Sequence, residues 1–223
     1  DGAYVEGAPI SATAALEASL PIFDAAIGQG SSLAKVGKAR ALLNLGRYSE
    51  AAAAVSGIAT TYTHYLEYSS SSTIPSNGPY SLQANGRYTV ANLEGGNGLA
   101  FRAPGGGDSW DPANADPRIP WYNDGPGFDP SLGDVALGKY FSFDDDLLLA
   151  DGVEARLIEA EAAFNGSGDW LGILNALRAQ SDVLIPLRTT DPPTDMTLAP
   201  LVDPGNDTDR LNMIMSERAF WMY

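Results

Sequence analysis

Aromatic side chains set among short polar ones are the residues of this sequence best suited to chemistry. Two stretches, residues 109–114 (SWDPAN) and 118–124 (RIPWYND), mix Trp or Tyr with Asp, Asn and Arg. Such rings stack on the apolar faces of sugars, while the polar neighbours bond to sugar hydroxyls. The alternative is that the rings anchor these loops to a core. The ligand-binding candidates are Trp110, Trp121, Tyr122, Tyr80, Asn114 and Arg118.

The carboxylates and the single histidine carry weaker signals. Residues 144–146 (DDD) and the acids of residues 108–116 supply the oxygen ligands that Ca²⁺ takes. Neither stretch has the register or glycine of an EF-hand loop, so solvated turn acids are favoured and no metal is expected. His64 has no Ser or Cys partner in a recognisable motif, which favours a structural role at a helix end. Residues 104–108 (PGGGD) lack the Lys-Ser/Thr of a phosphate-binding loop, and no cofactor is expected.

The charge balance limits the classes of partner. The chain has 223 residues, of which 13 are basic and 28 acidic, for a net charge of −15. Nucleic acid binding needs a basic surface, so nucleic acid is not expected as a partner. The absence of cysteine excludes disulfides, thiolate nucleophiles and cysteine-ligated zinc.

Two helix pairs are expected to carry the loops. In residues 151–180, apolar side chains recur every three or four positions on both sides of an Asn-Gly-Ser-Gly break, which predicts two helices folded back on each other. Asp169 or Ser167 can cap the second helix. Residues 33–59 repeat the pattern, with Gly46 as the stop and Ser49 as the cap. Neither pair can bury its apolar face alone, so each is expected to pack on the other.

The remaining segments differ in character. Residues 1–32 hold one weak helix, capped by Ser11 or Thr13, that Pro21 should kink or split. Residues 60–145 form a long irregular loop insertion, rich in aromatic residues, with short strands at 87–90 and 138–143. Residues 210–223 begin a last helix. Its inward side chains are expected to be Leu211, Ile214, Met215, Ala219 and Met222, and its outward ones Arg210, Glu217 and Arg218.

Four stretches, in order along the chain, resemble the SusD/RagB family of outer-membrane nutrient-uptake lipoproteins. They are residues 39–51 (ARALLNLGRYSEA), residues 116–118 (DPR) ahead of Trp121, residues 154–161 with 174–178 (EARLIEAE and LNALR), and residues 216–221 (SERAFW). Each stretch alone is unspecific, because many helix pairs contain such text. Together they span nearly the whole chain.

The resemblance implies an all-α protein, a single domain over residues 1–223 with tetratricopeptide-like helix pairs and a loop insertion that builds the ligand surface. It also implies a binding protein rather than an enzyme. Such a protein lies on the outer face of the outer membrane, captures a glycan, and delivers it to a TonB-dependent, SusC-like transporter. The family's lipid-bearing cysteine and the segment after residues 216–221 have no counterpart here, so a chain truncated at both ends is expected.

Two other functions remain open. A tetratricopeptide-like core also suits a protein–protein scaffold or a self-assembling surface protein, because stacked helix pairs leave a face for partners. Phe220 and Trp221 are expected to be uncovered unless another chain covers them, and self-association could use them. The third function is hydrolysis of a glycan by paired carboxylates, although nothing marks which two would flank the scissile bond.

Overall fold

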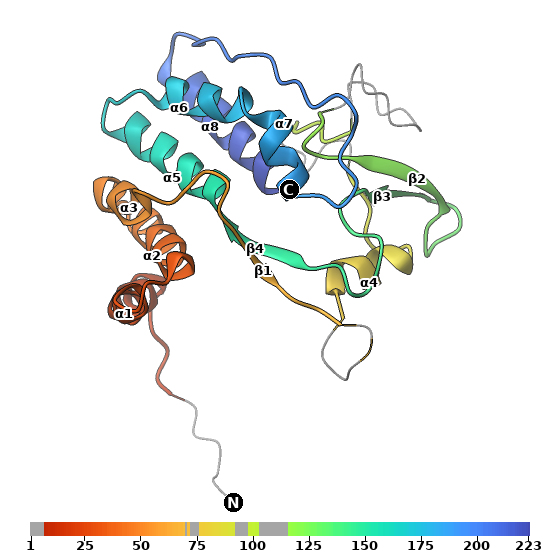
Figure 1. Cartoon of the computed structure of the whole chain (residues 1–223), viewed down its shortest axis with the longest axis horizontal. Helices are drawn as coiled ribbons and strands as arrows, with labels where there is room; N and C mark the ends of the chain where they lie inside the picture. The colour runs from red at the N-terminus through yellow and green to blue at the C-terminus, as the bar shows by residue number, and fades with distance from the viewer. Residues whose placement is uncertain (1–6, 70, 72–75, 92–97, 103–115) are drawn as a thin grey trace, which may run out of the picture.

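The computed structural model describes residues 7–69, 71, 76–91, 98–102 and 116–223 of the chain. This part is mostly helical, with two small two-stranded sheets (Figure 1). Its elements are α1 Ala12–Ile27, α2 Ser32–Asn44, α3 Tyr48–Val55, β1 Thr63–Leu66, α4 Gly78–Ala84, β2 Trp121–Pro126, β3 Gly133–Leu137, β4 Leu147–Asp151, α5 Gly152–Asn165, α6 Trp170–Arg178, α7 Ser181–Leu184, a 3₁₀ turn Ile185–Leu187, and α8 Asp207–Met222. No helix in the described part is long and apolar enough to cross a membrane.

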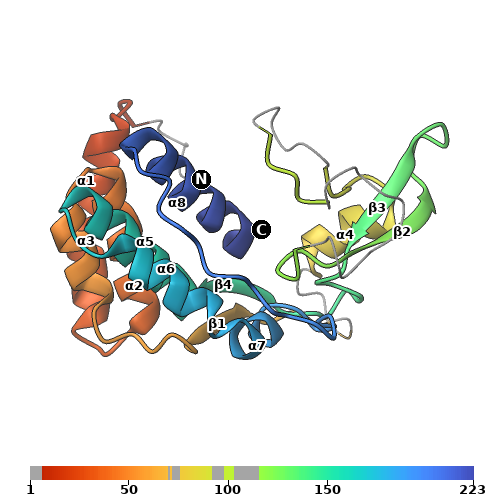
Figure 2. The same ribbon diagram turned by 90° about the horizontal axis from the view of Figure 1, so that it is seen from above.

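Most of the helices lie on one side of the molecule (Figure 2). The β2–β3 hairpin lies on the other side, together with helix α4. The antiparallel ribbon of β1 and β4 runs between the two sides. His64 lies in this ribbon, opposite Ala150, and not at a helix end as expected. The structure is mostly helical, as predicted. The prediction of an all-α protein, however, leaves out the two small sheets.

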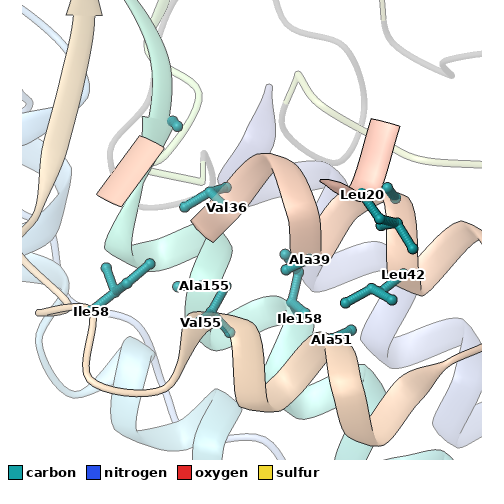
Figure 3. Packing of buried hydrophobic residues seen from close by; sticks show 11 residues of the cluster. Leu20, Val36, Ala39, Leu42, Ala51, Val55, Ile58, Ala155 and Ile158 are labelled. Carbon is teal, nitrogen blue, oxygen red and sulfur yellow. The ribbon is translucent and has the colours of Figure 1, made fainter. Parts of the chain in front are cut away.

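Helix α5 is the central element because it is buried on two faces. One face, with Ala155 and Ile158, packs against Val36 of α2 and Val55 of α3, as Figure 3 shows. The opposite face packs on α6 and α8, and Val153, Leu157 and Ala160 belong to that second core. The Asp151 side chain caps α5 by accepting from the Glu154 amide at 2.7 Å.

The predicted helix ends agree with the structure in part. Asp169 caps α6, and Gly46 takes a positive φ of 71° where α2 stops. Ser49 does not cap α3, which begins at Tyr48 without a side-chain cap. Pro21 was expected to kink or split the first helix, and it does not split it: α1 runs through Pro21 and packs on α2.

The strands predicted at residues 87–90 and 138–143 do not form. Side-chain oxygens there accept hydrogen bonds from backbone amides that would otherwise pair with a neighbouring strand. At residues 87–90, Thr89 Oγ1 accepts from the Val135 amide at 2.9 Å, so only Val90 reaches the β3 backbone, through Val135 O at 2.8 Å. At residues 138–143, the Asp145 carboxylate accepts from the amides of Phe141 and Ser142. The hairpin forms instead from residues 121–126 and 133–137.

The buried face of α8 also differs from the prediction. Leu211 and Met215, expected inside, are exposed, and Glu217, expected outside, is buried with Ile214 and Trp221. The spacing of apolar residues predicted the wrong buried face for α8, because the Glu217 carboxylate is held in the interior by ion pairs with two arginines.

Gly152 offers a test of the packing around α5. Its amide donates to Tyr62 O at 2.8 Å, and a Cβ atom here would lie 2.0 Å from Ala59 O. We expect Gly152→Ala to lower the free energy of unfolding by about 1–3 kcal/mol, because backbone must move to make room. Urea unfolding measures this. Gly78→Ala is the matched control, since among the described residues no atom beyond its own helix and chain neighbours lies within 4 Å of its Cβ position; equal losses in both variants would contradict the close approach.

Candidate ligand-binding site

An open pocket of 730 Å³ lies where the hairpin meets the segment before α8. Three aromatic side chains line it: Trp121 and Tyr122 of β2, and Phe141. Residues 191–194 (DPPT) also line it, with exposed Asp191 and Thr194 side chains. An aromatic wall beside a few polar groups is the usual composition of a small-ligand site.

Tyr122 and Phe141 form the most regular part of the wall. Their rings are stacked, with centroids 6.0 Å apart and planes inclined by 11°. The Tyr122 hydroxyl accepts from Gln83 Nε2 at 3.5 Å. Burial and the nearby Asp124 carboxylate raise the pKa of Tyr122, so its hydroxyl stays neutral and can donate.

Gln83 of α4 positions both sides of this aromatic pair. Its buried amide group accepts from the Leu137 amide at 3.0 Å and donates to Tyr140 O at 3.3 Å. One side chain therefore joins the hairpin to the segment that carries Phe141. The far wall is fixed similarly, since Thr189 Oγ1 donates to Gly138 O at 2.6 Å.

Trp121 is both a core residue and a wall of the pocket. It is 2% exposed and packs with Ile119, Val135 and Leu137 in a third core beneath the hairpin. Arg102 approaches its ring, with the guanidinium carbon 6.0 Å from the centroid. Trp121 therefore exposes very little of its surface to the pocket, whereas Phe141 is 42% exposed.

Of the predicted site residues that the structure describes, Trp121 and Tyr122 come together here, and Tyr80 and Arg118 do not. Tyr80 lies on α4 and packs edge-on against Phe143, with centroids 5.0 Å apart, and does not line this pocket. Trp110 and Asn114 lie outside the described residues.

The structure corrects the prediction that Arg118 binds a ligand. The Arg118 guanidinium lies in the interior and not on a ligand surface. It is 6% exposed and donates to Asp116 and, at 2.9 Å, to Glu217. It also lies over the rings of Phe220 and Trp221, 5.1 and 5.2 Å from their centroids. These carboxylates outweigh the burial of the charge and raise the pKa of Arg118.

The end of α8 is covered within the chain. Trp221 is 1% exposed, and Phe220 packs edge-on against Phe101 at 5.1 Å. The expectation that Phe220 and Trp221 lie uncovered is therefore wrong. Phe220 packs against the third core beneath the hairpin, and Trp221 belongs to the second core with residues of α5 and α6.

Sequence reasoning missed Phe141 and Asp191 as wall residues. Both occur in stretches rich in aromatic residues or proline, but nothing local marks them as neighbours of Tyr122. The described residues contain no group of three or more histidine or carboxylate side chains placed to hold a metal ion.

Comparison of the chain with protein-family models, curated proteins and solved structures finds no match. The site must therefore be interpreted from its own geometry.

The buried carboxylate that holds Arg118 can be tested by a single change. Glu217 also accepts from Arg178 at 2.7 Å, so Glu217→Gln leaves the buried Arg118 and the partly buried Arg178 without a common anion. We expect the free energy of unfolding to fall by about 3–5 kcal/mol, as measured by urea unfolding.

Asp207→Asn is the control for this prediction, because Asp207 of the same helix pairs with Arg210 at an exposed site. Its loss should change stability little, since solvent screens that pair. A loss in Glu217→Gln no greater than in the control would show that the buried network contributes little.

Proposed function

We propose that this protein captures a glycan in the pocket walled by Trp121, Tyr122 and Phe141. The observation that carries the proposal is the pairing of stacked, partly exposed rings with exposed Asp191 and Thr194 across an open pocket of 730 Å³. Pyranose rings present C–H groups that pack on aromatic faces, and their hydroxyls bond to carboxylate and hydroxyl oxygens.

The proposed action is binding and release, without covalent chemistry. Among the described residues that line the pocket, Asp191 is the one carboxylate, whereas glycoside hydrolysis by the usual route needs two that flank the scissile bond. The pocket is also open, which suits a protein that binds a ligand and then releases it to a partner.

The scaffold supports a wider version of the proposal. The α2–α3 and α5–α6 hairpins pack through α3 and α5, an arrangement that we interpret as tetratricopeptide-like. Together with the four stretches that resemble the SusD/RagB family, this favours a lipid-anchored protein on the outer face of the outer membrane. Its partner would be a TonB-dependent, SusC-like transporter that receives the glycan.

A self-assembling scaffold is the less supported function. It depended on uncovered Phe220 and Trp221 side chains, whereas Trp221 is buried and Phe220 is partly buried against Phe101.

The glycan proposal is tested by affinity electrophoresis through gels that contain a panel of polysaccharides. We expect at least one polysaccharide to retard the protein. Tyr122→Ala and Phe141→Ala should each weaken that binding by about three- to tenfold, since an aromatic stacking contact contributes about 0.5–1.5 kcal/mol.

Phe128→Ala is the matched control, because Phe128 is an exposed aromatic at the hairpin end, outside the pocket. It should bind as the wild type does. Retardation by no polysaccharide would refute glycan capture, while equal binding by all three variants would move the site away from this pocket.

A further inference from the structure

The exposed charges that the structure describes at the aromatic pocket are carboxylates. Asp191 lines the pocket and is exposed, and no lysine or arginine is among the described lining residues. Asp124, two residues after Tyr122 on β2, is exposed as well. The whole chain has a net charge of −15, so the charge at the pocket has the sign of the protein as a whole.

No cation of the described residues neutralises these two carboxylates, because neither takes part in an ion pair there. The nearby cations are buried and have other partners. Lys139 Nζ donates to the main-chain oxygen of Tyr223 at 2.8 Å, and Arg188 forms an ion pair with Asp151. Both carboxylates at the pocket therefore remain available to a positively charged ligand.

The charge of Asp124 reaches the aromatic wall. Burial raises the pKa of Tyr122, and the Asp124 carboxylate raises it further, which requires that this carboxylate is ionised and close to the ring. Arg102 contacts the Trp121 ring, with its guanidinium carbon 6.0 Å from the centroid, but does not line the pocket. The side of the wall that carries Tyr122 thus lies in a negative field.

Aromatic rings beside an unpaired carboxylate suit an ammonium group better than a neutral one. The faces of aromatic rings carry negative potential and attract cations. An ammonium group also donates charge-assisted hydrogen bonds to a carboxylate, which are about twice as strong as bonds between neutral groups. A neutral sugar gains only the weaker bond from Asp191, and the carboxylates repel a uronic acid or a sulfated sugar.

We propose that the aromatic pocket selects glycans that carry protonated amino groups, such as chains of glucosamine units. The apolar face of the sugar packs on Tyr122 and Phe141, and its ammonium group pairs with Asp191. This specificity rests on the proposed glycan capture. It also means that acidic glycans are rejected, because the repulsion that excludes them comes from the same carboxylates.

The test compares three glycans that differ in charge. Calorimetric titration of the 223-residue chain is made with a glucosamine tetrasaccharide, its N-acetylated counterpart and a galacturonic acid tetrasaccharide, at about pH 6, where the amine is protonated. We expect the glucosamine tetrasaccharide to bind at least about threefold more tightly than its N-acetylated counterpart, as for an exposed ion pair or cation–π contact. The galacturonic acid tetrasaccharide should not bind.

Asp191→Asn should remove the preference for glucosamine, because asparagine keeps the shape and an acceptor oxygen but lacks the charge. The N-acetylated tetrasaccharide should bind this variant about as it binds the wild type. Asp182→Asn is the matched control, since Asp182 is exposed on α7, does not line the pocket, and its replacement removes the same net charge. An undiminished preference in Asp191→Asn would overturn the proposal.

The wild type alone gives a second measurement. Raising the salt concentration from about 0.01 M to about 1 M shortens the Debye length from about 30 Å to about 3 Å. The affinity for the glucosamine tetrasaccharide should then approach that of its N-acetylated counterpart, which should change little.

Three results would overturn the amino-sugar specificity: equal or weaker binding of the glucosamine tetrasaccharide, binding of neither it nor its counterpart, or tight binding of the galacturonic acid tetrasaccharide. Glycan capture itself fails only if no polysaccharide of the panel retards the protein. The two failures are therefore distinguishable.

Discussion

The buried Glu217 carboxylate is the interaction on which the placement of the aromatic hairpin depends. It lies on α8 and accepts from Arg178 of α6 at 2.7 Å and from Arg118, just before β2, at 2.9 Å. Asp116 also binds Arg118, so two carboxylates and two guanidiniums form one set, with Arg118 and Glu217 buried at its centre. Such a set is stable only when all its members are present. It therefore fixes Trp121, three residues after Arg118, relative to the helices.

Local information in the sequence was enough to predict the helical hairpins but not the face of α8. Asp169 caps α6, and α5 and α6 follow their apolar spacing, because these signals lie within a few residues. Glu217 was placed outside because its partners lie 99 and 39 positions away in the chain. The strands were misplaced for a related reason, since Thr89 and Asp145 occupy backbone amides that alternation alone assigns to a ladder.

The candidate site could be predicted only where its residues are neighbours in sequence. Trp121 and Tyr122 were found because a polar, aromatic stretch contains both. Phe141 and Asp191 join them through contacts of the fold, namely the ring stack and the bond from Thr189 to Gly138.

The central claim is that a glycan binds against the stacked rings of Tyr122 and Phe141. It is tested most directly by nuclear magnetic resonance of the aromatic side chains, while an oligosaccharide from a retarding polysaccharide is titrated into the protein. The account predicts that the ring resonances of Tyr122 and Phe141 shift together and saturate, while those of Tyr48 on α3 stay in place. Saturable shifts confined to rings outside the pocket, with Tyr122 and Phe141 unchanged, would contradict it.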